Sequence, residues 1–87
     1  MAESIQEKVQ RLYQSTFRMD SPLPYQTEDD PDNARIFQRW TDDDVEEVFI
    51  KRIIITTDVN KKTYTTTYAF DLWSNRVTAT YYAVPFV

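Results

Sequence analysis

Three segments in the second half of the chain decide the fold: FIKRIIITT over residues 49–57, TYTTTYAFDLW over residues 63–73 and VTATYYAVPF over residues 77–86. β-Branched and aromatic residues dominate all three, as is typical of strands. Asn60 and Asn75 lie between the segments, and asparagine tolerates the left-handed backbone of tight turns. The pattern predicts a three-stranded antiparallel meander over residues 49–87.

The turns set the register of this meander. We expect a two-residue loop at Asn60 and Lys61 and another at Ser74 and Asn75. The second loop would pair Trp73 with Arg76, Leu72 with Val77, Phe70 with Ala79 and Tyr68 with Tyr81. One face, which we expect to receive a helix, then carries Phe49, Ile53, Ile55, Tyr64, Tyr68, Phe70, Leu72, Val77, Ala79 and Tyr81.

The opposite face of the predicted sheet mixes apolar, aromatic and threonine side chains with two arginines. A solvated face normally alternates to polar residues, so an exposed apolar patch here indicates an interface. Alternatively, residues 22–33 or a second helix could cover it. Its members are Ile50, Arg52, Ile54, Thr65, Thr67, Trp73, Arg76, Thr78, Thr80, Tyr82, Val84 and Phe86.

The first segment of the chain predicts a helix over residues 5–18. Ser4 and Glu7 have the spacing of a capping box, in which each side chain accepts a hydrogen bond from the other's backbone N–H. The apolar residues recur at helical spacing and form one narrow stripe, which the small core needs. They are Ile5, Val9, Leu12, Tyr13 and Phe17.

Between this helix and the strands, residues 20–33 predict an acidic loop with three prolines. Asp30 before Pro31 is a typical helix start, so we expect a short helical region within residues 31–47. With 87 residues and 10.4 kDa, the chain is one domain by size. The predicted fold class is α+β.

Three absent residue types exclude several function classes. Without cysteine the chain has no disulfide or thiolate, and without histidine it lacks the commonest metal ligand and acid–base catalyst. Without glycine it cannot form the loops that cradle phosphates in nucleotide-binding enzymes. We therefore expect a non-catalytic protein with no cofactor and no metal site.

Charge divides the chain into two halves. Residues 1–47 hold 12 acidic and 5 basic residues, a net of −7, and residues 48–87 hold 2 acidic and 5 basic residues, a net of +3. Such asymmetry steers encounters with a complementary partner or between copies of the chain. The predicted acidic surface comprises Asp29, Asp30, Asp32, Asp42, Asp43 and Asp44.

No apolar stretch approaches the roughly 20 residues that cross a bilayer, and residues 1–15 lack the apolar centre of a signal peptide. We therefore expect a cytoplasmic protein without a transmembrane segment. Its predicted function is to bind another protein, or a second copy of itself as a homodimer, as an assembly or regulatory module. The predicted partner-binding residues are Trp73, Tyr82, Phe86, Ile54, Arg52 and Arg76.

Two alternative functions remain open at this stage. The acidic residues could imitate a phosphate backbone and occupy a nucleic-acid-binding protein, in which case binding would weaken steeply with salt. The aromatic residues of the second face could instead stack single-stranded nucleic acid. Nucleic acid is an unlikely partner, because 14 acidic residues outnumber 10 basic ones and phosphate neutralisation dominates such binding.

Overall fold

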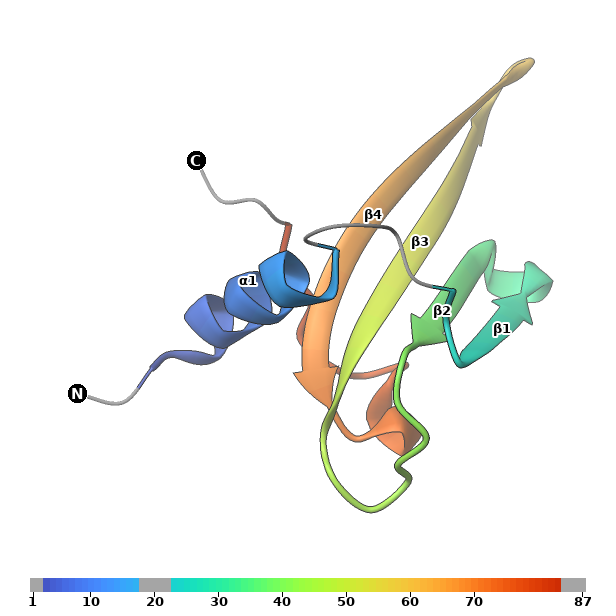
Figure 1. Cartoon of the computed structure of the whole chain (residues 1–87). Coiled ribbons are helices and arrows are strands. Elements are labelled where there is room, and N and C mark those ends of the chain that lie inside the picture. Colours follow the sequence, from blue (N-terminus) through green and yellow to red (C-terminus); the bar gives the residue numbers. More distant parts are fainter. Residues whose placement is uncertain (1–2, 18–22, 84–87) are drawn as a thin grey trace.

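The structure, a computed structural model, describes residues 3–17 and 23–83. Within these ranges one α-helix lies against one antiparallel sheet, whose strands follow one another in the order β1-β2-β3-β4 (Figure 1). The α+β class is confirmed. The prediction of three strands is wrong, because the sheet has four and only two of them belong to the predicted meander.

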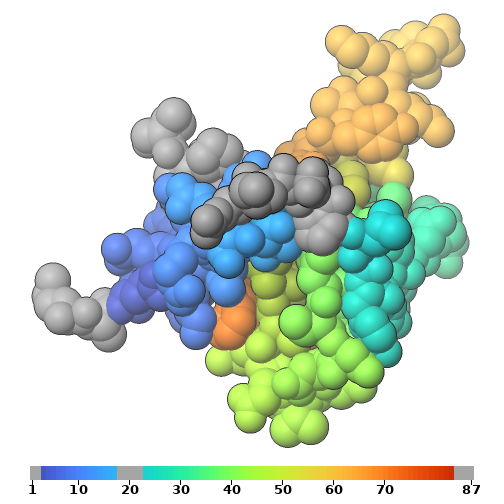
Figure 2. Space-filling view, in the orientation of Figure 1, coloured from blue at the N-terminus to red at the C-terminus, as the bar shows by residue number. Residues whose placement is uncertain are grey.

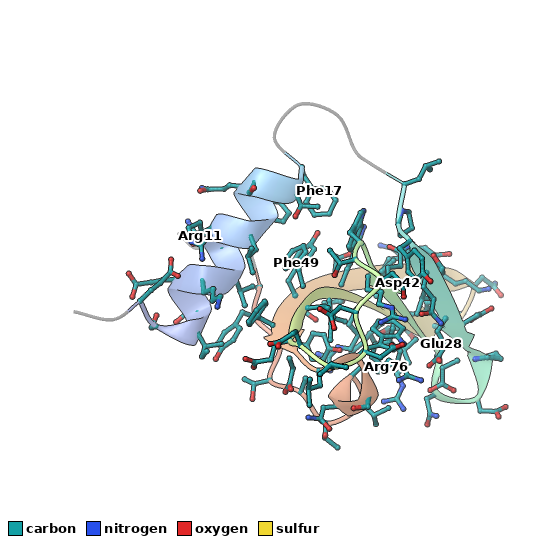
Figure 3. The ribbon with its side chains drawn as sticks, turned by 60° about the horizontal axis from the view of Figure 1, so that its bottom comes forward. Arg11, Phe17, Glu28, Asp42, Phe49 and Arg76 are labelled. Atoms are coloured by element: carbon teal, nitrogen blue, oxygen red, sulfur yellow. The ribbon has the colours of Figure 1, made fainter. Side chains whose placement is uncertain are left out.

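Helix α1 (Ile5–Thr16) begins at the predicted capping box. Ser4 Oγ accepts from the Glu7 N–H at 3.1 Å, and the Glu7 carboxylate accepts from the Ser4 N–H at 3.2 Å. Val9 is fully buried against Phe49 and Tyr68, and Figure 3 shows Phe17 and Phe49 on this side of the sheet. The helix is confirmed, although it ends at Thr16 and not at residue 18.

Strands β3 (Val48–Asp58) and β4 (Lys61–Asp71) form the predicted first hairpin. Asp58 pairs with Lys61, so the loop is Val59–Asn60 and not Asn60–Lys61. Val59 has a φ of 54°, and a positive φ at the first loop residue alone matches a type II′ turn. The left-handed position thus falls on a β-branched residue that resists it.

Residues 26–39 form a β-hairpin, so the predicted acidic loop and second helix are wrong. β1 (Gln26–Asp30) and β2 (Arg35–Arg39) pair with each other, and β2 also pairs with β3. Pro31 does start a helical turn, the 3₁₀ element η1 (Pro31–Asn33), but Ala34 at a φ of 52° reverses the chain. Phe37 is completely buried in β2. This burial of apolar surface favours the strand over the predicted helix.

The predicted third strand is reduced to one bridge, between Tyr68 and Tyr82 instead of Tyr81. After β4 the chain forms the 3₁₀ turn η2 (Trp73–Asn75) where a hairpin loop was expected. Trp73 is thereby buried with Phe37 and Ile50, which stabilises this path over a straight hairpin. The predicted end of this strand, residues 84–86, lies outside the described residues.

The two faces of the sheet are covered by different parts of the chain. α1 covers the face that carries Phe49 and Tyr68, termed the helix face. On the other side, termed the second face, Trp73 and Tyr81 pack on Phe37 and Ile50. The alternative that residues 22–33 or a second helix covers the second face is wrong, since the segment that follows β4 does so. The expectation that Trp73 is exposed on this face is also wrong, since Trp73 is itself part of that cover.

The distal part of the β3–β4 hairpin, residues 55–64, reaches beyond both covers and is termed the arm (Figures 1 and 2). β2 pairs with β3 only as far as Ile54, and the last backbone bond beyond that pair joins the Ile55 N–H to the Ala34 carbonyl. The molecule measures 47 × 31 × 26 Å along its principal axes. The arm is therefore a two-stranded ribbon attached to a four-stranded body.

Candidate functional site

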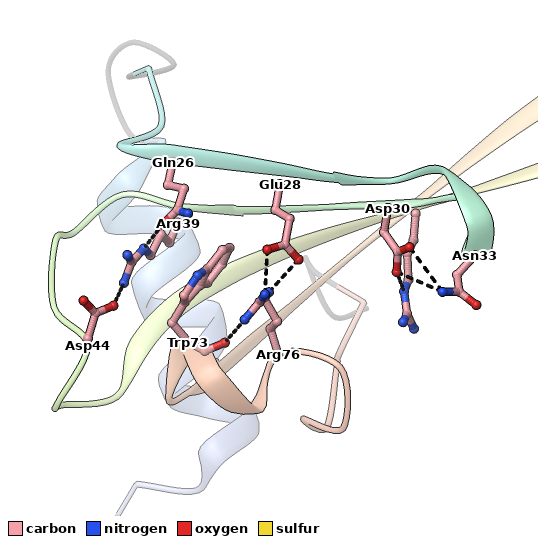
Figure 4. Close-up of polar contacts among 9 residues, drawn as sticks. Gln26, Glu28, Asp30, Asn33, Arg39, Asp44, Trp73 and Arg76 are labelled. Atoms are coloured by element: carbon pink, nitrogen blue, oxygen red, sulfur yellow. Dashed lines mark hydrogen bonds and ion pairs between the residues drawn. The ribbon is translucent and has the colours of Figure 1, made fainter.

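The second face is organised by arginines that each bond a carboxylate. Arg76 makes two hydrogen bonds to the Glu28 carboxylate, the first from Nε at 2.8 Å (Figure 4). The two residues are 48 positions apart in sequence, so this pair ties the segment after β4 to β1. Arg35 Nε donates to Asp30 at 2.8 Å and thereby joins β1 and β2 next to the turn of their hairpin.

The most buried of these arginines is Arg39, which is 5% exposed. Its guanidinium donates to Gln26 at 2.9 Å, to the Asp43 carbonyl at 3.1 Å and to the Asp44 carboxylate at 2.8 Å. The Trp73 ring lies between two guanidinium groups, 4.9 Å from that of Arg39 and 4.8 Å from that of Arg76. Trp73, Arg39 and Arg76 together cover this half of the second face.

Arg52, on β3, differs from these three arginines because it bonds no carboxylate among the described residues. Its guanidinium lies 4.0 Å from the centre of the Tyr81 ring. Its Nε is buried without a hydrogen-bond partner, and so is the hydroxyl of Thr67, its cross-strand neighbour on β4. Leaving buried polar atoms unpaired is unfavourable, so this is the part of the second face that a ligand would complete.

Burial shifts the pKa values of Arg52 and Tyr81. Loss of solvent lowers the pKa of Arg52, and the nearby positive charge of Arg35 lowers it further, against an opposing effect of Tyr81. Burial raises the pKa of Tyr81. Tyr81 therefore stays neutral and Arg52 stays charged near neutral pH, and the site presents a partly desolvated cation against an aromatic ring.

Beyond Arg52 the second face continues onto the arm through Ile54, which is half-buried. Ile54 pairs with Arg35 on one side and with Thr65 on the other. Arg52, Ile54, Thr65 and Thr67 therefore form a contiguous patch, termed the Arg52 patch. It combines one unpaired cation with one apolar side chain and two threonines.

The structure brings only two of the predicted partner-binding residues together, Arg52 and Ile54. Trp73 is 6% exposed and Arg76 is engaged by Glu28, so neither is a surface anchor. Tyr82 packs in the helix-face cluster. Phe86 lies outside the described residues.

Sequence reasoning missed Tyr81 as a neighbour of Arg52, because it assigned Tyr81 to the helix face. A one-residue register shift exchanges the faces of a strand, and the observed bridge is shifted by one residue from the predicted one. Tyr81 therefore lies on the second face, where it packs against Phe37. Two adjacent tyrosines offer no sequence signal for choosing between the faces.

The predicted acidic residues do not form one array. Asp30 and Asp44 bond arginines, and Asp43 accepts from the Val45 and Glu46 N–H groups at 2.9 Å, which lowers its pKa. Asp42 interacts with the Tyr25 hydroxyl and raises the pKa of that tyrosine. Asp29 and Asp32 are exposed near η1.

A hollow with a volume of about 540 Å³ lies on the helix face. Four aromatic side chains line it, together with Leu23, Pro24, Gln38 and Lys51. Lys51 Nζ lies 5.9 Å from the centre of the Phe17 ring. Within residues 3–17 and 23–83, no group of histidine, cysteine, aspartate and glutamate side chains has an arrangement that could hold a metal ion.

No protein-family model, curated protein or solved structure matches this chain. In the described part of the chain no helix has both the length and the apolar character needed to cross a membrane.

Proposed function

We propose that this chain is a non-catalytic protein-binding module whose Arg52 patch binds an extended partner segment that carries one carboxylate beside apolar residues. One observation carries the proposal: among residues 3–17 and 23–83, Arg52 has no carboxylate partner, whereas Arg35, Arg39 and Arg76 each bond one. A partner carboxylate would repeat the pairing that the rest of the face already uses.

The chemistry of the patch favours a protein partner over nucleic acid. Phosphate binding gains most of its free energy from several cations acting together, and the carboxylates of Glu28, Asp30 and Asp44 already neutralise the neighbouring arginines. A single guanidinium against a tyrosine ring, with an isoleucine next to it, suits one carboxylate in an otherwise apolar segment. We further propose that the protein acts in the cytoplasm, where a chain without cysteine needs no oxidising environment.

The experiment is a titration of the full-length protein, followed by NMR, with a short blocked peptide that carries one glutamate between valines. The matched control peptide carries glutamine in place of glutamate. We expect the glutamate peptide to shift the Arg52 Nε–H signal and the backbone signals of Ile54 and Thr67, and the glutamine peptide to shift them far less.

Two protein variants separate the patch from general charge effects. Arg52→Met removes the unpaired guanidinium and should abolish the response, and it should not lower stability, because it also removes an unsatisfied buried polar atom. Arg11→Met removes an exposed arginine of α1 that pairs with Glu3. This variant should bind the peptide like the wild type. A response that survives Arg52→Met contradicts the proposal.

The acidic-mimic and single-strand functions give different results in the same assay. A short oligothymidylate that binds at the second face would support the nucleic-acid function. A basic peptide whose binding weakens steeply with salt and shifts Asp29, Asp32 and Asp42 would support the mimic. Either result, with no effect of the glutamate peptide, would replace the function proposed here.

A further inference from the structure

The outer edge of β4 is open along the arm. β4 is the last strand of the sheet, and among the described residues only Tyr82 bonds its outer edge, at Tyr68. The stretch from Lys61 to Thr67 therefore presents unpaired backbone groups along its outer side, and five of its seven residues are exposed. A long exposed edge strand is a template for pairing with another strand.

The direction of the free backbone groups follows from the bridge. Tyr68 both donates to and accepts from Tyr82, at 2.9 and 2.7 Å, so the Tyr68 N–H and C=O point outward. Because these groups alternate sides along a strand, Lys62, Tyr64 and Thr66 also point theirs outward. The residues between them bond β3.

Charge favours a second copy of the chain as the occupant. From Thr63 to Phe70 the strand has no charge, and its only lysines are Lys61 and Lys62 at one end. The excess acidic charge lies in residues 1–47, away from the arm (Figure 1). Two copies joined along their arms would keep their acidic bodies apart and would place the two lysines of each copy opposite uncharged threonines of the other.

An antiparallel arrangement about a two-fold axis at Tyr64 uses the whole open edge. Tyr64 then faces Tyr64 of the second copy, and Lys62 faces Thr66, so no lysine faces a lysine. Each of the three outward-pointing residues exchanges its backbone bonds, which gives roughly six hydrogen bonds across the interface. The two Tyr64 rings, each 62% exposed in the single chain, would form a cross-strand aromatic pair.

We propose that two copies of this chain pair antiparallel through the β4 edge, residues 61–67, with Tyr64 at the centre. Pairing would stabilise the arm, since an isolated two-stranded ribbon is marginally stable in water. The interface is small, so we expect a dissociation constant in the micromolar range. This contact uses the outward backbone groups of Lys62, Tyr64 and Thr66, whereas the Arg52 patch uses side chains on the second face, so the two proposals involve different groups.

A cysteine cross-link tests the register directly, because the chain has no cysteine of its own. In the proposed dimer the two Tyr64 Cα atoms are about 5.5 Å apart, within the range that a disulfide spans. The Tyr64→Cys variant should therefore form a covalent dimer rapidly under mild oxidation. The control is Thr56→Cys, an exposed position on β3 of the same arm, whose copies would be at least about 14 Å apart.

Sedimentation equilibrium of the unmodified chain measures the contact without a cross-link. We expect a dimer whose dissociation constant changes little with salt, because backbone hydrogen bonds hold it. Thr66→Pro should raise that constant by about tenfold or more, since it removes an outward N–H while leaving the bonds to β3 in place. Arg52→Met should leave the dimer unchanged, so failure of the peptide-binding proposal and failure of this one are distinguishable.

Two results would overturn the proposal. One is a monomer at every concentration, and the other is equal cross-linking of Tyr64→Cys and Thr56→Cys. If Thr66→Pro unfolds, the wild-type sedimentation and the cysteine pair still decide the outcome.

Discussion

Replacing Trp73 with alanine should lower the free energy of unfolding by about 3–5 kcal/mol. The indole is 6% exposed and packs against Phe37, Val48 and Ile50. Burial of about 150–250 Å² at about 25 cal/mol/Å² gives roughly 4–6 kcal/mol as an upper bound. The contacts of the ring with Arg39 and Arg76 are lost as well.

Urea unfolding followed by circular dichroism measures this loss. A chain of 87 residues has a total stability of roughly 4–13 kcal/mol, so the variant should unfold at a much lower urea concentration. The control is Val77→Ala, at a residue that is 50% exposed, which should change stability by about 0.5 kcal/mol or less. If Trp73→Ala lowered the free energy of unfolding by less than about 1 kcal/mol, the burial of Trp73 would be refuted and the residue would be exposed, as the sequence predicted.

Three further predictions concern stability. Burial raises the pKa of Tyr68 from 10.0 to about 12. Because the pKa is higher in the folded state than in the unfolded state, the contribution of Tyr68 to the free energy of unfolding is complete below pH 10 and is lost as the pH rises through about 12. The urea midpoint should therefore fall over this range, and it should fall less in Tyr68→Phe. Arg39→Met should cost about 2–4 kcal/mol because that guanidinium is buried and hydrogen-bonded, whereas Asp44→Asn should cost less than about 1 kcal/mol because its carboxylate is 72% exposed; urea midpoints of the two variants check this order. Val59→Gly should raise the free energy of unfolding by about 0.5–1 kcal/mol, and with it the melting temperature, since glycine adopts the φ of 54° without strain.

The parts of the fold that the sequence predicts are those in which local and tertiary preferences agree. In α1 the Ser4–Glu7 capping box, the 3.6-residue apolar period and the packing against Phe49 all favour the same helix. In β3 and β4 the β-branched residues are both strand formers and core residues. Their bounds are therefore found to within two residues.

β1 and β2 were missed because their inward-facing residues are charged. Glu28 and Asp30 alternate on β1 and point to arginines that come from elsewhere in the chain. Acidic residues near prolines resemble a solvated loop until those partners are known. Arg35, Phe37 and Arg39 do alternate as a strand should, and this period was the available signal.

The missed third strand has a different cause, since local preference and core burial oppose each other there. Residues 77–82 have strong strand propensity, but a hairpin at Ser74 and Asn75 would have left Trp73 on the surface. Burying one indole is worth several kcal/mol, while the propensities of a few residues sum to less. The chain therefore forms η2, and the segment that follows it brings the Tyr81 ring over Arg52.

The net charge of the chain describes its surface poorly. Glu28, Asp30 and Asp44 are bonded by arginines, so the count of 12 acidic residues in residues 1–47 overstates the free acidic surface. The chain as a whole still carries −4 and repels a strongly acidic partner at distances up to the Debye length of about 10 Å. A strongly basic partner is attracted to the acidic body, but the positive charge of Arg52 repels it at the patch. In the proposed function, Arg52 would therefore select segments of low total charge that place one carboxylate next to an apolar residue, because among the described residues it is the arginine of this face without a carboxylate partner.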